Sequence, residues 1–206
     1  MRALYLAQRC TAVGRQSGGR TRWRLVENQK LDPRIEFRAV DLASPIKVDE
    51  RFDLAISLEV AEHLPATRAD SFVELLCHCA DVVIFGAATK LQGGTNHINE
   101  QWQSYWVERF EGHGYTCIDL FRQSSWGSNE VDWWYQQNAF LFVNKDAELS
   151  LLKLTQHFPP TMTDIVHPNN FLPKVSGYHQ AMTSPDLKLC ARLFSRYIAI
   201  KLGLVR

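Results

Sequence analysis

The chain of 206 residues is 46% hydrophobic and 22% charged, a composition that supports a packed core and excludes wholesale disorder. Its length favours a single domain of ordinary size, and its formal net charge of +1 gives no argument for nucleic-acid binding. The five cysteines are an odd number in a chain too large to depend on disulfides, so we expect a reducing, cytoplasmic setting. No apolar run reaches the roughly 18 residues of a membrane span, and no secretory signal is expected.

Residues 1–35 are predicted to form an irregular, basic N-terminal segment. Seven arginines and lysines lie between Arg2 and Lys30, against the single acid Glu27. Glycines stand among these arginines without helical or strand periodicity, so a loop is the expected conformation.

Regular elements are predicted for residues 36–145, which we expect to be one α/β domain. Strands are expected at 37–41, 52–58, 81–86, 115–122 and 138–144. Helices are expected after a cap at Thr67 and over 99–112, because apolar residues recur there at helical spacing. This order predicts a mostly parallel sheet that ends in an antiparallel pair, with ligands at the carboxyl ends of the strands.

Residues 146–206 are predicted to be a helical C-terminal extension. Four prolines break its first part into turns: Pro159, Pro160, Pro168 and Pro173. Its end, 186–204, is expected to be an amphipathic helix with basic residues on one side. Docking onto its own domain or onto a partner is the more economical interpretation of this helix, and contact with a membrane surface is the alternative.

Glu59, Glu62 and His63 form the sharpest local pattern in the sequence. If a helix begins near Glu59, spacings of three and four residues place all three side chains on one face. Two carboxylates and an imidazole can hold a divalent metal, and a histidine beside carboxylates also suits a general base near neutral pH. A third interpretation is structural, with the glutamates favouring a helix N-terminus and the histidine filling a polar niche.

His97 lies in the loop Gly93–His97, soon after the predicted strand at 81–86. This loop is expected to lie over the same carboxyl edge as Glu59, and its glycines permit close backbone approach. His97 could therefore supply a fourth metal ligand or a substrate contact. A surface loop without such a role is the alternative.

Three other features have structural interpretations beside the functional ones. Asp41, at the end of a predicted strand, could accept a hydrogen bond from a ligand amino group such as that of adenine, or could form a turn.

Cys77 and Cys79 point apart on a helix and lack a second pair at zinc-site spacing, so no zinc site is expected. An aromatic segment could clamp a flat or sugar-like substrate or cover the sheet; it contains Trp126, Trp133, Trp134 and Tyr135.

Four segments together resemble the class I S-adenosylmethionine-dependent methyltransferases. They are RAVDLASPI (Arg38–Ile46), FDLAISLEVAEHLP (Phe52–Pro65), DVVIFGAAT (Asp81–Thr89) and NHINEQWQSYWVERFEGHGY (Asn96–Tyr115). The resemblance implies a Rossmann-like sheet of seven strands, parallel except for a reversed last strand, with helices on both sides. It also implies S-adenosylmethionine as the cofactor.

The resemblance implies roles for residues at the ends of the predicted strands 37–41 and 52–58. Asp41 matches the acid that meets the adenine of the cofactor. Ser57, Leu58 and Glu59 match the strand end that lines the cofactor and the reaction site.

A metal site is implied by the same resemblance. Glu62 and His63 match a pair that binds a divalent metal in ubiquinone-pathway O-methyltransferases and small-RNA 3′-terminal methyltransferases. A glutamate at the position of Glu59 completes the site in those enzymes. His97 is a candidate extra ligand, and His63 and Glu62 are the candidate catalytic residues.

The N-terminal end departs from the pattern of the family. The family opens with a strand and a loop of the type acid-x-G-x-G-x-G, whose backbone passes close to the cofactor. In the stretch AVGRQSGG, residues 12–19, the glycines have neither a strand ending in an acid before them nor an apolar helix after them. We therefore expect the N-terminal strand and helix of the fold to be incomplete.

The leading functional hypothesis is methyl transfer from S-adenosylmethionine to an oxygen or nitrogen of a small polar or sugar-like acceptor. A divalent metal is an additional candidate cofactor, a small-molecule substrate is the expected partner, and no nucleic-acid partner is expected. The alternative is a truncated, non-catalytic remnant of the fold with a binding role. A nucleotide-dependent oxidoreductase is disfavoured because the dinucleotide glycine fingerprint is absent.

Overall fold

The computed structural model describes residues 3–6, 40–147, 153, 157–159, 162–184 and 186–204. The chain divides into two compact units, the first reaching Ile165 and the second beginning at Val166. Within these described ranges, no helix is both long enough and apolar enough to cross a bilayer.

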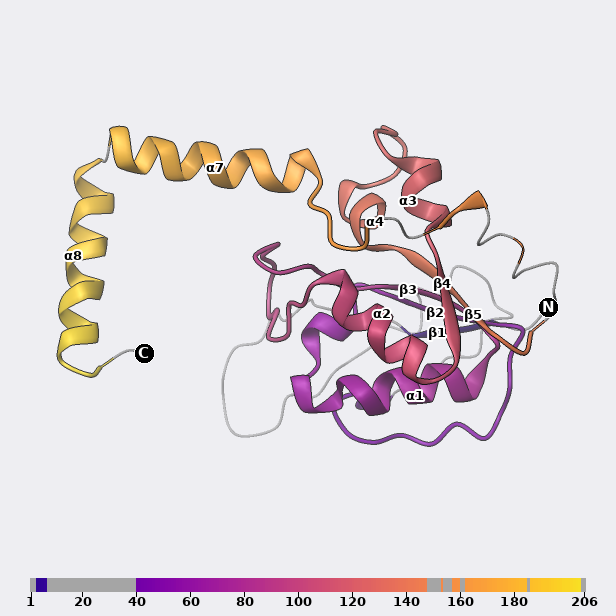
Figure 1. The fold of residues 1–206 in the computed structure, drawn as a ribbon. Coiled ribbons are helices and arrows are strands. Elements are labelled where there is room, and N and C mark those ends of the chain that lie inside the picture. The colour runs from indigo at the N-terminus through magenta and orange to yellow at the C-terminus, as the bar shows by residue number, and fades with distance from the viewer. Residues whose placement is uncertain are drawn as a thin grey trace, which may run out of the picture. The chain divides into compact units, whose positions relative to one another are not determined.

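A five-stranded sheet forms the centre of the first unit (Figure 1). Its strands are β1 (Ala3–Leu6), β2 (Leu54–Leu58), β3 (Val82–Gly86), β4 (Tyr115–Ile118) and β5 (Phe140–Asn144). They lie in the order β1-β2-β3-β5-β4. β1, β2 and β3 are parallel, whereas β5 runs antiparallel to both β3 and β4. The predicted α/β sheet with a reversed last strand is therefore confirmed, and within the described residues it has five strands where the resemblance implies seven.

Helices cover both faces of this sheet. α1 (Ala69–Cys79) and α2 (Gln103–Gly112) pack on one face, and α3 (Leu120–Ser125) with α4 (Trp133–Asn138) lie on the other (Figure 1). The strands are apolar on both sides because each side meets a helix layer. On β5, for example, Phe142 joins the core beneath α1 and α2, while Leu141 and Val143 belong to the opposite cluster.

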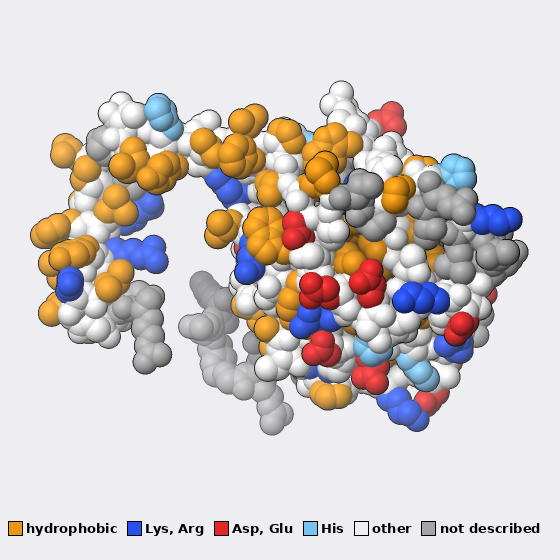
Figure 2. Space-filling view, in the orientation of Figure 1, with side chains coloured by type: hydrophobic (Ala, Val, Ile, Leu, Met, Phe, Trp, Pro, Cys, Tyr) orange, Lys and Arg blue, Asp and Glu red, His pale blue; other side chains and the backbone are white. Residues whose placement is uncertain are grey.

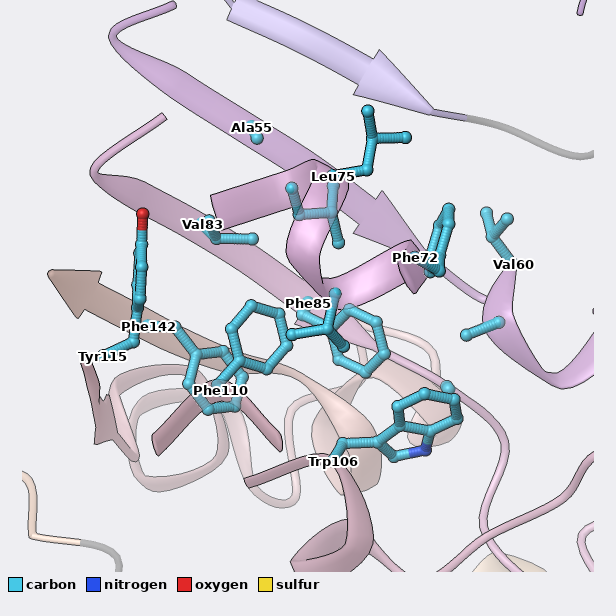
Figure 3. Close-up of a cluster of buried hydrophobic side chains, with 14 of the residues drawn as sticks. Ala55, Val60, Phe72, Leu75, Val83, Phe85, Trp106, Phe110, Tyr115 and Phe142 are labelled. Carbon is cyan, nitrogen blue, oxygen red and sulfur yellow. The ribbon is translucent and has the colours of Figure 1, made fainter. Parts of the chain in front are cut away.

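Aromatic rings fill the core between the sheet and helices α1 and α2 (Figure 3). Phe110 of α2 stacks on Phe142 of β5 with ring centroids 3.9 Å apart, and Phe85 of β3 meets Phe110 edge-on at 5.2 Å. All three side chains are at most 2% exposed to solvent. This packing fixes β2 and β3, whose carboxyl ends carry the residues of the candidate site.

The N-terminal region differs from the prediction in two places. Ala3–Leu6 lies within the segment predicted to be irregular, yet it forms β1 in parallel register with β2. Four residues are too few to show a period, and the pairing depends on a strand far along the chain. Most of the predicted strand 37–41 lies outside the described residues, and its described part, Val40 and Asp41, is not in a strand.

Several predicted element bounds also change. The predicted cap at Thr67 is wrong, because a short 3-10 helix (Ala66–Arg68) precedes α1 and no side chain caps it. The predicted strand 115–122 stops at Ile118, because Asp119 and Arg122 form a buried ion pair at 2.7 Å one helical turn apart. The chain from 120 to 125 is therefore helix α3, and part of the predicted Trp-rich loop is helix α4.

The boundary of the first unit lies at Ile165, beyond the predicted boundary at residue 145. Arg122 donates to the carbonyls of Met162 and Thr163 at 2.6 and 2.7 Å, and Gln103 donates to that of Ile165 at 2.8 Å. These bonds hold residues 162–165 against the first unit, a connection that local sequence patterns do not reveal.

The second unit consists of two helices, α7 (Pro168–Thr183) and α8 (Leu187–Lys201). The expected amphipathic helix at the C-terminal end is α8. The interpretation of Pro168 and Pro173 as turn formers is wrong. Pro168 stands at the start of α7, where the missing N–H costs nothing, and Pro173 lies inside the same helix.

Candidate functional site

Glu59 is the first residue after β2, at the carboxyl end of the parallel strands. Its backbone has φ 53°, in the left-handed region, and its N–H donates to the carbonyl of Gly86 at the end of β3 (2.9 Å). The α-helix predicted to begin at Glu59 does not form; a 3-10 helix, Ala61–His63, follows instead. A non-glycine residue held in this conformation costs of order 1–3 kcal/mol, which is typical of functional sites.

Glu62 lies in this 3-10 helix with its side chain fully buried. Within the described part of the chain, no hydrogen bond of ordinary geometry reaches either of its carboxylate oxygens, although the backbone amides of Glu62 and Ala88 lie close enough to lower its pKa. Its backbone carbonyl accepts from the amides of Ile98 and Asn99, both at 2.9 Å. These two bonds draw the loop that contains His97 over the carboxyl end of β2.

Glu62, His63 and His97 offer ligand atoms that all lie within 4.8 Å of one another. Oε1 of Glu62 is 4.0 Å from Nε2 of His63 and 3.9 Å from Nε2 of His97. The two imidazole rings meet edge to face, with centroids 4.8 Å apart. Three of the four predicted metal ligands therefore converge on one point.

The Nδ1 atom of each imidazole, which faces away from Glu62, lies within hydrogen-bond distance of an oxygen acceptor. Nδ1 of His63 lies 3.2 Å from the carbonyl oxygen of Asn96, and Nδ1 of His97 lies 2.9 Å from Oε1 of Glu100. An acceptor at Nδ1 favours the tautomer that carries its proton there, which leaves the lone pair on Nε2. In both histidines Nε2 is the atom nearest Glu62, an arrangement typical of metal-binding imidazoles.

Gly94 leaves the space that the His97 ring occupies. A Cβ atom at position 94 would overlap Cε1 and Nε2 of His97. Close approach therefore explains Gly94, and the group that approaches is the imidazole itself, whereas Gly93 has open space around it and a left-handed φ of 76°.

Burial controls the proton affinities of the site. Desolvation, with a further contribution from the Glu59 charge, raises the pKa of Glu62 from 4.5 to about 8. Burial also raises the pKa of Glu59, while hydrogen bonds from Asn138 and Gln92 oppose that rise. Burial lowers the pKa of His63 below 6.5. The shift of His63 favours its neutral form near pH 7.

The residues present fit a divalent cation. Glu62 is a buried carboxylate without a hydrogen-bond partner among the described residues, and two imidazole Nε2 atoms lie about it. Glu59 adds a second carboxylate that interacts electrostatically with Glu62. A mixed set of carboxylate and imidazole ligands suits Mn²⁺, Fe²⁺ or Zn²⁺, and carboxylates also suit Mg²⁺.

The other predicted site residues have different surroundings. Ser57 is fully buried on β2, and its hydroxyl has no hydrogen-bond partner in the described ranges. Leu58 ends β2, and its side chain lies against Gly86. Asp41 is exposed and accepts from the amide of Ala43 (3.0 Å) and the hydroxyl of Ser44 (3.1 Å). This local turn matches the structural interpretation of Asp41, and its contact with a cofactor stays a prediction.

The remaining sequence features have mainly structural surroundings. Cys77 and Cys79 are free thiols, and burial raises the pKa of Cys77 to about 12, which disfavours the thiolate that a metal would need. In α4, Trp133 packs edge-on against Trp134 with centroids 5.5 Å apart. Trp126 is 43% exposed. A substrate clamp formed by these aromatic residues stays a prediction.

Sequence reasoning missed the amide side chains around Glu59. Gln92 follows β3, and Gln137 and Asn138 end α4, immediately before β5. β5 is antiparallel to β3, so its first residues lie at the carboxyl ends of the parallel strands. This topology could have indicated Asn138, but only once the pairing of the reversed strand was known.

No family model and no curated protein matches the chain. Among solved structures, the chain is similar to one described as the methyltransferase domain of bacterial CtHen1-C, at 22% sequence identity and a TM-score of 0.36. The match covers 51% of this chain and 58% of that one, so the chain spans little more than half the length of the solved structure.

Proposed function

We propose that this chain is an S-adenosylmethionine-dependent methyltransferase with a divalent cation held by Glu59, Glu62, His63 and His97. The methyl acceptor is an oxygen or nitrogen of a small polar or sugar-like molecule. The observation that carries the proposal is the fully buried Glu62 carboxylate, which lies beside two imidazoles at the carboxyl end of a parallel sheet.

Burying the carboxyl group of Glu62 costs free energy. A buried carboxyl group without a partner costs several kcal/mol if it is charged, and it usually takes up a proton instead. A cation among Glu62, His63 and His97 would compensate that cost and draw on lone pairs that already converge. The site therefore has the properties expected of a metal centre rather than of a structural polar cluster.

The position of the site supports ligand binding at the same edge. Parallel α/β sheets bind their ligands outside the carboxyl ends of the strands. β1 and β2 are parallel neighbours there, and the buried Ser57 hydroxyl belongs to that end of β2. We assign Ser57, Leu58 and Glu59 to the wall of the S-adenosylmethionine site, and Asp41 to its adenine. Holding cofactor and acceptor in line can contribute roughly 7–11 kcal/mol to the rate.

In the proposed reaction, His63 and Glu62 have different roles beside the cation. A bound cation would lower the pKa of an acceptor hydroxyl by acting as a Lewis acid. His63, oriented through Nδ1 by the carbonyl of Asn96, presents Nε2 as a ligand or as the base that accepts the acceptor's proton. With a cation bound, Glu62 would give up its proton and supply a carboxylate ligand next to both imidazoles.

Methyl transfer is tested by incubating the chain with tritiated S-adenosylmethionine, Mn²⁺ or Mg²⁺, and a panel of sugar, polyol and amine acceptors. We expect metal-dependent transfer that is lost in Glu62→Ala and His63→Ala. Glu108→Ala, which changes an exposed acid on α2, serves as the matched control. Transfer at the wild-type rate in both site variants would contradict the proposed roles.

A non-catalytic methyltransferase-fold remnant is the second candidate, favoured by the absence of the acid-x-G-x-G-x-G motif from the sequence. Calorimetry with S-adenosylmethionine separates the two candidates. Micromolar binding is expected of the enzyme. No binding at millimolar cofactor, with the chain folded, would favour the remnant.

A further inference from the structure

The carboxylate of Glu59 receives one side-chain amide N–H on each oxygen. Nδ2 of Asn138 donates to Oε1 and Nε2 of Gln92 donates to Oε2, both at 3.1 Å. The three residues come from the end of β2, the loop after β3 and the end of α4. Elements distant in the sequence thus meet at this one carboxylate.

The orientation of Gln92 is itself fixed by other donors. Its Oε1 accepts from Nδ2 of Asn138 (2.9 Å), Nε2 of Gln137 (3.0 Å) and the backbone amide of Thr89 (3.2 Å). An amide oxygen surrounded by three donors cannot exchange places with its NH₂ group without losing these bonds. Nε2 of Gln92 must therefore face Glu59.

Asn138 is held in the same way. Nε2 of the fully buried Gln137 donates to Oδ1 of Asn138 at 2.9 Å, which leaves Nδ2 of Asn138 facing Gln92 and Glu59. We call Gln92, Gln137 and Asn138 the amide clamp. Gln137 and Asn138 are buried and Gln92 is partly buried, so rotating any of these amides would cost hydrogen bonds that water replaces poorly.

Glu59 and Glu62 thus differ sharply, although both lie at the carboxyl end of β2. Glu59 has a side-chain amide donor on each oxygen, whereas among the described residues no hydrogen bond of ordinary geometry reaches Glu62. A carboxylate offers about four lone-pair directions, so two amide bonds leave Glu59 able to accept further contacts. The amide clamp therefore fixes the orientation of the Glu59 carboxylate and leaves its other lone pairs able to bind a ligand.

We infer that Gln92 and Asn138 are positioning residues that orient the Glu59 carboxylate for the cation, with Gln137 locking both amides. This inference rests on the proposed metal site. It assigns to the chain an outer layer of residues that act through Glu59 and do not contact the cation. Residues of this kind commonly change metal affinity about 10–100-fold when altered.

The test uses substitutions that keep the shape of the side chain and replace its amide NH₂ donor with an oxygen. Asn138→Asp and Gln92→Glu each place a carboxylate oxygen against an oxygen of Glu59. Gln123→Glu makes the same chemical change at an exposed residue of α3 and is the matched control. Mn²⁺ affinity, measured by calorimetry on the full chain, is expected to fall at least about tenfold in the two clamp variants and to stay unchanged in the control.

Glu59→Gln provides the background that separates positioning from a general loss of structure. If Asn138 acts through Glu59, its substitution should matter little once Glu59 is changed. The double variant Glu59→Gln, Asn138→Asp is then expected to bind Mn²⁺ less than about threefold more weakly than Glu59→Gln alone. An equal loss in both backgrounds would overturn the inference, as would wild-type affinity in Asn138→Asp.

A second readout remains informative if the wild-type chain binds no Mn²⁺, which would sink the metal part of the proposed function. In the metal-free chain, Asn138→Asp is expected to lower the unfolding midpoint in the presence of Glu59 and much less in Glu59→Gln, where the repulsion is removed. Equal lowering in both backgrounds would show that the clamp does not act on Glu59.

Discussion

The two compact units expose their hydrophobic side chains to very different degrees. In the first unit, Phe72, Phe110 and Phe142 are completely buried. In the second, Phe171 on α7 is 53% exposed and Phe194 on α8 is 67% exposed. Figure 2 shows hydrophobic side chains gathered along the surfaces of α7 and α8. The first unit therefore has a core that can hold a site rigidly, whereas the second presents apolar surface.

Charged groups follow the same division. The first unit buries the carboxyl group of Glu62 and the guanidinium of Arg122, the latter paired with Asp119. On α8 all the charged side chains are basic and exposed: Lys188, Arg192, Arg196 and Lys201. Buried charge needs a specific partner, and exposed charge of one sign attracts an oppositely charged surface. The first unit thus pairs its buried guanidinium with a carboxylate, whereas α8 exposes charge of one sign.

Truncating equivalent aromatic residues in the two units should give the largest contrast. Phe110→Ala removes a ring stacked on Phe142 and is expected to lower the free energy of unfolding by about 3–5 kcal/mol. Phe194→Ala changes an exposed side chain, with an expected effect within about 0.5 kcal/mol. Chemical denaturation measures both. A comparable loss in Phe194→Ala would show that α8 is packed as a core element.

The pH dependence of stability tests the buried charge of the first unit. Because the pKa of Glu62 is raised from 4.5 to about 8, the folded metal-free chain keeps a proton that the unfolded chain has released. The free energy of unfolding should therefore fall as pH rises through this window. The lowered pKa of His63 has the opposite effect around its ordinary value of 6.5, so the clearest range lies between pH 6.5 and 8.

Glu62→Gln is the control for this pH dependence. The variant lacks the titrating group, so its stability should change less than that of the wild type between pH 6.5 and 8. Denaturation curves at several pH values provide the measurement. An unchanged slope in the variant would assign the titration to another group.

Two glycine substitutions sharpen the comparison further. Gly94→Ala inserts a methyl group into the position of the His97 imidazole and should weaken Mn²⁺ binding about tenfold. Gly177→Ala lies within α7, where an added Cβ meets nothing, and should stabilise that helix by up to about 1 kcal/mol. Calorimetry and circular dichroism, respectively, report the two effects. Wild-type Mn²⁺ affinity in Gly94→Ala would remove His97 from the proposed ligand set.

A further prediction concerns α8 and lipid surfaces. Its basic residues Lys188, Arg192 and Arg196 recur every four positions, and apolar residues occupy much of the remaining circumference. Such a helix is expected to bind vesicles that contain anionic phosphatidylserine, with about 1 kcal/mol contributed by each basic residue. Co-sedimentation should fall in Arg192→Glu. Equal sedimentation with neutral vesicles, or none with either, would favour docking onto a protein surface.

The sequence predicted the sheet well because its signals are local. The apolar runs at 52–58 and 81–86 form the buried strands β2 and β3. A continuous apolar run predicts a buried strand even when the strand that it pairs with is unknown. The short apolar piece Ala3–Leu6 became a strand only through its pairing with β2, which no local pattern contains. The ion pair between Asp119 and Arg122 likewise converted the end of a predicted strand into helix.

The candidate site was predicted from residue types and its geometry was not. Glu62, His63 and His97 were singled out, and they do converge. The predicted reason, one face of a helix starting at Glu59, is wrong, because a left-handed residue and a 3-10 helix bring the groups together. The amide clamp could not be foreseen, since glutamine and asparagine are common in loops and their role depends on tertiary contacts.

Titration of Mn²⁺ into the metal-free chain tests the central claim most directly. We expect one saturable site in the wild type, loss of at least about a hundredfold in affinity in Glu62→Ala and in His97→Ala, and no change in the exposed control Glu108→Ala. Absence of saturable binding in the folded wild type, or wild-type affinity in both ligand variants, would contradict it.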